Sequence, residues 1–415
     1  MDKIVLFHDK KECCGCGACM NACPKSAIRM AEDEHGFVYP QINEELCIGC
    51  GACAKACLYQ NRPDFHSVQS VYAAATKDDA VLKQSASGGA FPVFAGEVLN
   101  HGGVVYGCAS VSENGTLEPR HIRIDKAEEI PLLQGSKYVQ SEIGDAYQKV
   151  KQDLLLEKDV LFTGTPCQIA GLKQYLKKDY DHLLTAEIIC HGVPSQRLFQ
   201  EFLDFYGKKL GGRITEIYFR DKTKGQGMFF RCVYEDSAGN KKEKSINGYL
   251  LAYMFFFLKS YTYRINCYSC PFAQPQRTAD ITLGDYWGFH EEYPQYRESQ
   301  GLSNSKGISC ILINSEKGKK IWDACQDRFI VLPSAFDKVA RHNDQLKKPS
   351  VYNSQREILL QVFEKEGYAG IERYFQAHFK KDIVKHAVSG AVPKDFKRLV
   401  KKMIGHLSHS EPHEG

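Results

Sequence analysis

The sequence predicts an α+β protein, and three observations support this fold class. Two cysteine-rich runs near the N-terminus flank a short segment with strand character, strands and helices alternate through the middle of the chain, and the C-terminal part is helical. A chain of 415 residues is too long for one typical core. We therefore expect three parts, at residues 1–62, 63–335 and 336–415.

The composition limits the functional classes. A hydrophobic content of 43%, a charged content of 25% and a net charge of +4 are ordinary for a soluble protein and give no indication of nucleic-acid binding. The most apolar run, residues 249–258, is much shorter than the roughly 20 residues of a membrane helix and predicts a buried helix. With no transmembrane segment and no signal peptide visible, we expect a cytoplasmic protein.

The cysteine-rich runs share one spacing, C-x2-C-x2-C-x3-C. This spacing is typical of bacterial ferredoxins with two 4Fe-4S clusters, in which the fourth cysteine of each run ligates the other cluster. The first predicted cluster has the ligands Cys13, Cys16, Cys19 and Cys57. The second has the ligands Cys23, Cys47, Cys50 and Cys53. Zinc usually takes separated C-x2-C pairs, so the doubled run favours iron.

Around these cysteines the sequence predicts a compact segment. Glycines inside both loops allow backbone amides to approach the sulfur atoms, and residues 28–43 predict two short strands around a His35–Gly36 turn. Cys14 lies off the repeat, and we expect no ligand role for it.

The next segment begins an α/β region. Residues 71–77 predict a strand, "SASGG" at 85–89 leads into an amphipathic helix, and a second strand starts at Val104. Small residues at a helix N-terminus bind anions such as a cofactor phosphate. They are also ordinary capping residues, and the sequence alone leaves both interpretations open.

Two later strands each end near a cysteine. "DVLFTG" at 159–164 predicts a buried parallel strand before Cys167, and "HLLTAEIIC" predicts another that ends at Cys190. In open α/β sheets, ligands bind beyond the carboxyl ends of such strands. Cys267 and Cys270 form a later C-x2-C pair. The sequence alone leaves three interpretations of these four cysteines open. They bind a third 4Fe-4S cluster, they bind zinc, or Cys167 and Cys190 are buried free thiols and the C-x2-C pair is unrelated to them.

Other features complete the prediction. An antiparallel hairpin is expected around Gly239–Asn240, and a strand followed by a helix over residues 307–326. From Phe336 the chain is helical and increasingly basic, which indicates either a solvated face or a docking surface for an acidic electron carrier. Five cysteines are expected to fill cores: Cys14, Cys108, Cys232, Cys310 and Cys325.

These pieces, in this order, resemble the coenzyme F420 hydrogenase/dehydrogenase beta-subunit family, as a bacterial-type member. Over roughly residues 1–330 the resemblance rests on the dicluster run and on "SASGGAF", "GSKYVQSEI", "LFTGTPCQIAGLK", "CHGVPS" and "CYSCPFA…RTADITLGDYWG". Members are iron–sulfur flavoproteins that carry FAD or a related flavin. The resemblance implies FAD and a third 4Fe-4S cluster on Cys167, Cys190, Cys267 and Cys270.

The resemblance also implies roles for other residues. Ser87, Gly88 and Gly89 would face the cofactor phosphates, Lys137 and Tyr138 would lie near the flavin ring, and Thr163, Gly164 and Thr165 would touch the same cofactor. His191 and Asp285 are candidate catalytic proton donors, although a loop histidine or aspartate is more often structural.

The function expected from the resemblance is that of an iron–sulfur flavoprotein oxidoreductase. Electrons pass between a one-electron carrier, either ferredoxin or a partner subunit, and an unidentified small-molecule substrate, and the flavin joins one-electron to two-electron chemistry. Two alternative functions stay open. The first is an electron-transfer subunit without its own substrate site, and the second is an accessory protein of polysaccharide biosynthesis whose clusters are structural.

Overall fold

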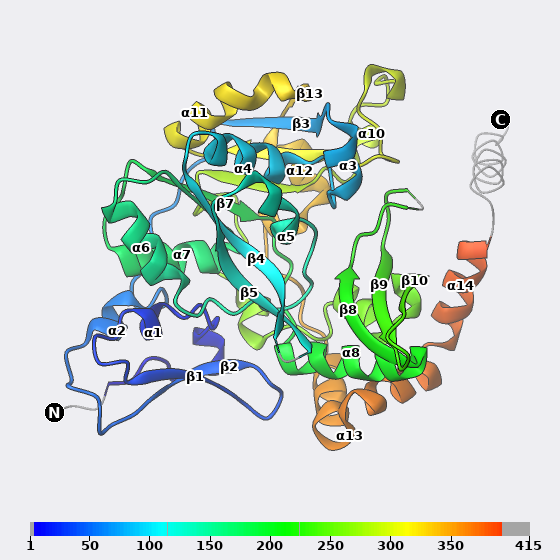
Figure 1. Ribbon diagram of the computed structural model, residues 1–415, viewed down its shortest axis with the longest axis horizontal. Helices are drawn as coiled ribbons and strands as arrows, with labels where there is room; N and C mark the ends of the chain where they lie inside the picture. The colour runs from blue at the N-terminus through cyan, green and yellow to red at the C-terminus, as the bar shows by residue number, and fades with distance from the viewer. Residues whose placement is uncertain (1–3, 114, 224, 392–415) are drawn as a thin grey trace, which may run out of the picture.

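The computed structural model describes residues 4–113, 115–223 and 225–391. It confirms the α+β prediction, with a small cysteine-rich segment packed below a large mixed sheet and helices at the C-terminal side (Figure 1). No helix in these ranges is long and apolar enough to cross a membrane. The apolar run 249–258 forms a 3-10 turn and the buried helix α9 (Ala252–Leu258), as predicted.

The N-terminal segment is built on a two-stranded sheet. Strands β1 (Ile28–Glu32) and β2 (Val38–Ile42) pair antiparallel around the predicted turn. The short helices α1 (Ala18–Asn21) and α2 (Ala52–Ala56) each start from a glycine at positive φ, Gly17 and Gly51. Ala18 and Ala56 are fully buried in a core shared with the large sheet, so the segment is anchored on the rest of the chain.

The large sheet has eight strands in the order β13-β3-β12-β11-β7-β6-β4-β5. Its centre is parallel, through the pairs β4–β6, β6–β7 and β7–β11, and the outer pairs are antiparallel. The strands are β3 (Ser70–Thr76), β4 (Val104–Glu113), β5 (Thr116–Ile124), β6 (Val160–Gly164), β7 (Leu183–Ile188), β11 (Ile281–Asp285), β12 (Ser309–Ile313) and β13 (Phe329–Ser334).

Helices cover both faces of this sheet because its central strands carry apolar side chains on each side. One core joins α4 (Ala90–Asn100) and α11 (Glu316–Cys325) to the sheet. On the opposite face α6 (Ala146–Leu155) and α7 (Pro166–Leu176) form a second core. The smaller helices are α3 (Asp79–Gln84), α5 (Ile130–Leu133), α10 (Phe289–Glu292) and α12 (Phe336–His342).

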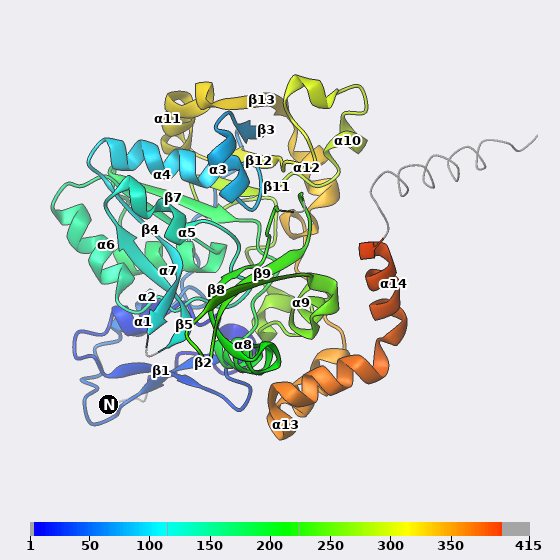
Figure 2. The ribbon, with the colours of Figure 1, turned by 45° about the vertical axis from the view of Figure 1, so that its right-hand side comes forward.

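A second layer lies beside the sheet (Figure 2). Strands β8 (Gly212–Tyr218), β9 (Phe229–Asp236) and β10 (Lys241–Asn247) form an antiparallel sheet that contains the predicted hairpin. An aromatic-rich core joins this sheet to α8 (Gln196–Leu210), α9 and α13 (Gln355–His378). Helix α14 (Lys380–Ala391) confirms helical structure in the C-terminal part, and the basic tail 392–415 lies outside the described residues.

Candidate functional site

The first predicted ligand set gathers at one place. Cys13 and Cys16 come from the loop that leads into α1, Cys19 lies on α1, and Cys57 caps the C-terminus of α2. Burial raises the pKa of Cys13 to about 11, Arg264 opposes this, and the charges of Cys16 and Cys57 add to it. Mutual repulsion of this kind requires sulfur atoms in close proximity, which is what a cluster site needs.

The second predicted set lies at the surface. Cys23, Cys47, Cys50 and Cys53 all line one small pocket. Cys50 is exposed, as are the side chains of Leu46 (51%) and Ile48 (50%) beside it. Cys50 therefore opens this set to solvent on one side, although Cys23 and Cys47 are partly covered and Cys53 is buried. No cysteine of the first set is exposed.

Both sets fit iron. Each supplies four soft sulfur donors, and the loop glycines at positive φ (Gly15, Gly17, Gly49 and Gly51) bring backbone amides close to the sulfur atoms. Burial raises the pKa values of Cys19 and Cys57, so metal binding would have to displace protons from these thiols.

The four remaining candidate cysteines meet at a large cavity. Strands β6 and β7 are adjacent and parallel, so Cys167 at the start of α7 and Cys190 just beyond β7 lie at the same edge of the sheet. Cys267 lies in a 3-10 turn and Cys270 follows it. Burial and the charges of Cys267, Cys167 and Cys270 raise the pKa of Cys190 well above its usual value. The geometry thus brings together the sulfur atoms that the sequence pattern suggested.

A buried ion pair holds the third set in position. Glu187, at the end of β7 and fully buried, accepts a 2.6 Å hydrogen bond from Nε of Arg277. The Arg277 guanidinium also donates to the carbonyls of Phe272 and Gln274 in the loop that follows Cys270. The pair therefore ties the Cys270 loop to the strand that leads to Cys190.

Cys14 lies between two ligand sets. Its thiol is buried and hydrogen-bonds both Cys16 of the first set and Cys167 of the third, which raises its own pKa and lowers that of Cys167 to about 7. The expectation that Cys14 only fills a core missed this contact, because nothing in the sequence brings residue 167 next to residue 14.

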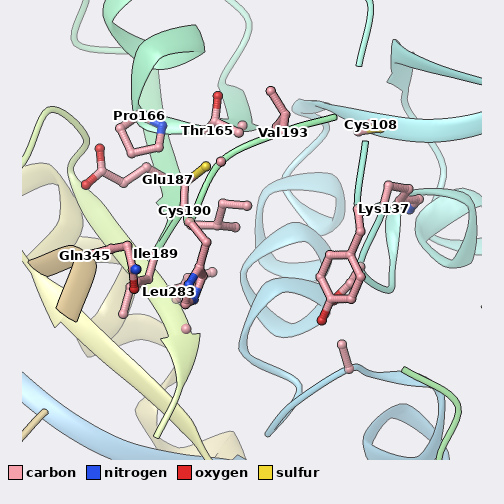
Figure 3. Close-up of a pocket in the computed structure, with 18 of the residues that line it drawn as sticks. Cys108, Lys137, Thr165, Pro166, Glu187, Ile189, Cys190, Val193, Leu283 and Gln345 are labelled. Carbon is pink, nitrogen blue, oxygen red and sulfur yellow. The ribbon is translucent and has the colours of Figure 1, made fainter. Parts of the chain in front are cut away.

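The cavity has a volume of about 480 Å³, within the usual range of about 300–1,000 Å³ for cofactor and ligand sites. Figure 3 shows Cys190 and Glu187 on one side and Lys137 and Cys108 on the other. Nearly all residues predicted to bind the cofactor or to act as proton donors line it, together with the third cysteine set: Ser87, Gly89, Lys137, Tyr138, Thr163, Gly164, Thr165, His191 and Asp285.

Gly88 does not line this cavity. Its amide donates to Oγ of Ser309 at 2.9 Å, and a Cβ at this position would clash with the β3 and β12 backbone. The Ser87 hydroxyl donates to the carbonyl of Ile308. Gly89, at φ 80°, precedes α4 and directs the N-terminus of that helix towards the cavity. The amides available to an anion are therefore those of α4, and glycine at 88 serves close packing.

The opposite wall carries a half-buried cation. Nζ of Lys137 donates to the carbonyls of Gln134 (2.7 Å) and Leu132 (3.3 Å), at the end of α5. Burial lowers the pKa of Lys137 to about 8, and the Cys108 side chain opposes this shift. Tyr138 is fixed by stacking on Phe257 at 4.3 Å. An anionic ligand in the cavity would complement the Lys137 charge.

A hydrogen-bond chain crosses the base of the cavity. The buried ring of His121 contacts the Thr163 carbonyl through Nε2 (3.0 Å) and the Ser141 hydroxyl through Nδ1 (3.1 Å). Gln168 donates to Ser141 at 2.9 Å, and its Oε1 accepts from Thr165. The Thr165 hydroxyl lies 3.2 Å from Sγ of Cys167. This chain fixes the β6–α7 turn that carries the third set.

The predicted proton donors lie towards the other end. Asp285 ends β11 and pairs with Arg220 at 2.9 Å, and the Arg220 guanidinium lies 5.2 Å from the centre of the Trp287 ring. Burial lowers the pKa of His191, and Asp285 opposes this shift. Both predicted residues thus face the same space, but Asp285 is already engaged in an ion pair.

Sequence reasoning missed several of these residues. Arg220, Arg264 and His121 reach the site from segments that carry no recognisable motif. The "RDK" of residues 220–222 and the "YR" before the Cys267 pair stand among polar residues, so their charges gave no signal of a buried site.

Comparisons with known proteins agree with this arrangement. Residues 12–61 match the 4Fe-4S dicluster domain, and residues 157–337 match the family described as the C terminus of the coenzyme F420 hydrogenase/dehydrogenase beta subunit. None of the curated proteins matches the chain. Among solved structures, a chain of a xenon-derivatised F420-reducing NiFe hydrogenase complex from Methanosarcina barkeri matches with 15% identity and a TM-score of 0.40. The match covers 76% of this chain and 94% of that chain, and a likeness at this score carries no argument about function.

The dicluster match coincides with the first two cysteine sets, and the second match spans the strands and loops that carry the third. The part of the chain that carries the third cysteine set, residues 157–337, is therefore similar to the C-terminal region of coenzyme F420 hydrogenase/dehydrogenase beta subunits, and it follows a segment that matches a 4Fe-4S dicluster domain.

Proposed function

We propose that the protein is an iron–sulfur flavoprotein oxidoreductase that passes electrons between a one-electron carrier and a two-electron substrate. The observation that carries the proposal is the single cavity in which the third cysteine set and the predicted flavin residues face one another. The match of residues 157–337 to a hydrogenase and dehydrogenase subunit family supports redox chemistry.

The cavity walls suit a flavin. Ile188 (48% exposed) and Leu283 offer apolar surface for a ring system. The N-terminus of α4 and the half-buried Lys137 offer positive charge to a phosphate or to a reduced ring. When bound, a flavin accepts electrons singly from clusters and delivers them in pairs.

In this proposal the residues have distinct roles. Cys167, Cys190, Cys267 and Cys270 hold a third 4Fe-4S cluster against the cofactor. Asp285 orients Arg220 at the end of the cavity, and His191 beside it holds or releases a proton for the substrate. In this proposal the chain has three domains, at residues 1–62, 63–335 and 336–415.

The carrier would dock at the second cysteine set. Cys50, Leu46 and Ile48 are exposed there, so a redox partner, either a ferredoxin or a neighbouring protein of the same complex, can approach the cluster closely. Electrons would then travel inward through the first set and past Cys14 to the third.

Anaerobic reconstitution tests the proposal. Iron and flavin are measured per chain, and three cubane clusters predict about twelve iron atoms beside one flavin. A yield of about eight iron atoms would remove the third cluster, and a flavin-free preparation would overturn the cofactor assignment. Loaded protein that exchanges electrons with dyes but converts no small molecule would instead favour an electron-transfer role without a substrate site.

A further inference from the structure

One buried arginine near the cavity lacks a carboxylate partner among the described residues. Four arginine side chains are buried near the cavity: Arg220 (7% exposed), Arg264 (0%), Arg277 (2%) and Arg356 (5%). Three of them pair with a carboxylate, Arg220 with Asp285, Arg277 with Glu187 and Arg356 with Glu357. Among the described residues Arg264 has no carboxylate partner, although it is the most deeply buried. A buried cation without a counterion is costly, so its environment has to supply negative charge in another form.

The contacts of Arg264 point to the cysteine ligands. Nε donates to the carbonyl of Cys13 at 2.8 Å, and one terminal nitrogen lies 3.7 Å from Sγ of the same residue. The other terminal nitrogen donates to Oε1 of Gln140 at 3.4 Å. The guanidinium stacks 4.1 Å above the centre of the Tyr39 ring. The guanidinium of Arg264 is therefore held in one orientation by its contacts with Cys13, Gln140 and Tyr39.

The same charge reaches both deeper cysteine sets. Arg264 precedes the Cys267 turn by three residues, and its amide donates to the carbonyl of Val193, just after Cys190. Its charge acts on the Cys13 and Cys16 thiols of the first set and on the Cys167 and Cys267 thiols of the third. Among the described residues, Arg264 is the only cation that figures in the main causes of the pKa shifts of these four cysteines in both sets.

We propose that Arg264 is a positioning residue that supplies the permanent positive charge between the first and third cysteine sets and stabilises the negative charge each gains on reduction. The third-set part rests on the proposed function above. Arginine suits the role because its guanidinium stays charged at any relevant pH and binds in a fixed fork. The first set is the closer of the two, so its reduction potential depends more strongly on this charge.

Substitution of Arg264 separates charge from packing. The variants Arg264→Lys and Arg264→Gln are purified anaerobically, and cluster midpoint potentials are measured by redox titration followed by electron paramagnetic resonance. We expect Arg264→Gln to shift the first-set potential to more negative values and Arg264→Lys to retain most of the wild-type value. Equal shifts in both variants, or unchanged potentials in Arg264→Gln with full iron content, would overturn the proposal.

A second pair of variants keeps Arg264 in place. Gln140→Glu puts a carboxylate at the position that accepts from Arg264, whereas Gln140→Met removes the same amide without adding charge. Both variants lose the donation from Gln140 to the Cys14 carbonyl, so the difference between them comes from the added carboxylate and its bond with Arg264. We expect a more negative first-set potential in Gln140→Glu than in Gln140→Met. Identical potentials would contradict the proposed role even if Arg264→Gln failed to fold.

The two proposals fail in different ways. An iron content of about eight atoms in the wild-type protein would exclude the third cluster. The first-set potential could then still be measured in every variant. Unchanged first-set potentials in protein with full iron and flavin would leave the proposed function intact and remove the role of Arg264.

Discussion

Gly171 lies directly against Cys16, although the two residues belong to different parts of the chain. A Cβ at position 171 would stand 3.0 Å from Sγ of Cys16 and 3.0 Å from the hydroxyl of Tyr147. Gly171 lies on α7, one turn after Cys167. One helix therefore carries a cysteine of the third set at its start and packs against the first set further along.

Gly171→Ala tests this packing. The added methyl has to displace Cys16, so we expect the variant to lose iron from the first set, with roughly four fewer iron atoms per chain. Gly96→Ala on α4 is the control, since the nearest side-chain atom to its new methyl is 3.9 Å away. Iron analysis and visible absorption decide the outcome. Full iron content in Gly171→Ala would mean that the first set tolerates the methyl.

Arg277→Met should destabilise the protein strongly. The substitution leaves Glu187 as an unpaired buried charge, and breaking such a pair costs about 3–5 kcal/mol. Urea unfolding of the metal-free chain measures the loss. The double variant Arg277→Met with Glu187→Gln removes both charges and should recover part of it. Failure of the double variant to recover any stability would indicate that Arg277 acts mainly through its bonds to the Cys270 loop.

Flavin affinity should fall at alkaline pH. Burial lowers the pKa of Lys137 to about 8 in the free protein, so the side chain is charged below pH 8 and neutral above it. A bound anionic group beside Lys137 raises its pKa. Above pH 8, flavin binding therefore requires Lys137 to take up a proton, and the affinity for flavin falls by up to about tenfold per pH unit. Fluorescence titration between about pH 6.5 and 9.5 measures this slope.

Two variants of Lys137 check the origin of that slope. Lys137→Met should bind flavin weakly with no slope in this range, whereas Lys137→Arg should bind without the alkaline loss because its guanidinium stays charged. A slope that persists in Lys137→Met would assign the titration to another group.

Chelation should remove iron from the second set first. Cys50 and its neighbours Leu46 and Ile48 are exposed, whereas the third set lies deep in the cavity. With a chelator and oxygen we expect an early loss of about four iron atoms. Alkylation and mass spectrometry should then find the label on Cys50 before Cys14. Simultaneous loss of all iron would show that access does not set the order.

Much of the fold was predictable because its signals are local. The cysteine runs define the candidate ligand sets over a few residues each, and the buried run 160–164 with its following helix is a short-range pattern that the structure confirms as β6 and α7. The hairpin around Gly239 is equally local, with β9 paired to β10.

What the sequence could not reveal depends on contacts between distant residues. The amide of Gly88 donates to Ser309, which is 221 residues away in the sequence. The "SASGG" segment that suggested a phosphate-binding loop therefore contains one glycine that is needed for packing. Arg264 meets Cys13 across 251 positions, and no spacing rule connects them. The ligand roles of the cysteines and the flavin contacts stay predictions.

The insertion of β11 between β7 and β12 has a consequence for biosynthesis. The eight cysteines of the first two sets are complete once residue 57 has been made, but Cys267 and Cys270 arrive only just before β11, and β11 needs β12 as its second neighbour. A chain leaving the ribosome therefore carries the eight cysteines of the first two sets early, whereas the third set can assemble only when nearly three quarters of the polypeptide has been translated. The order of the strands makes the third set the last of the three to come together.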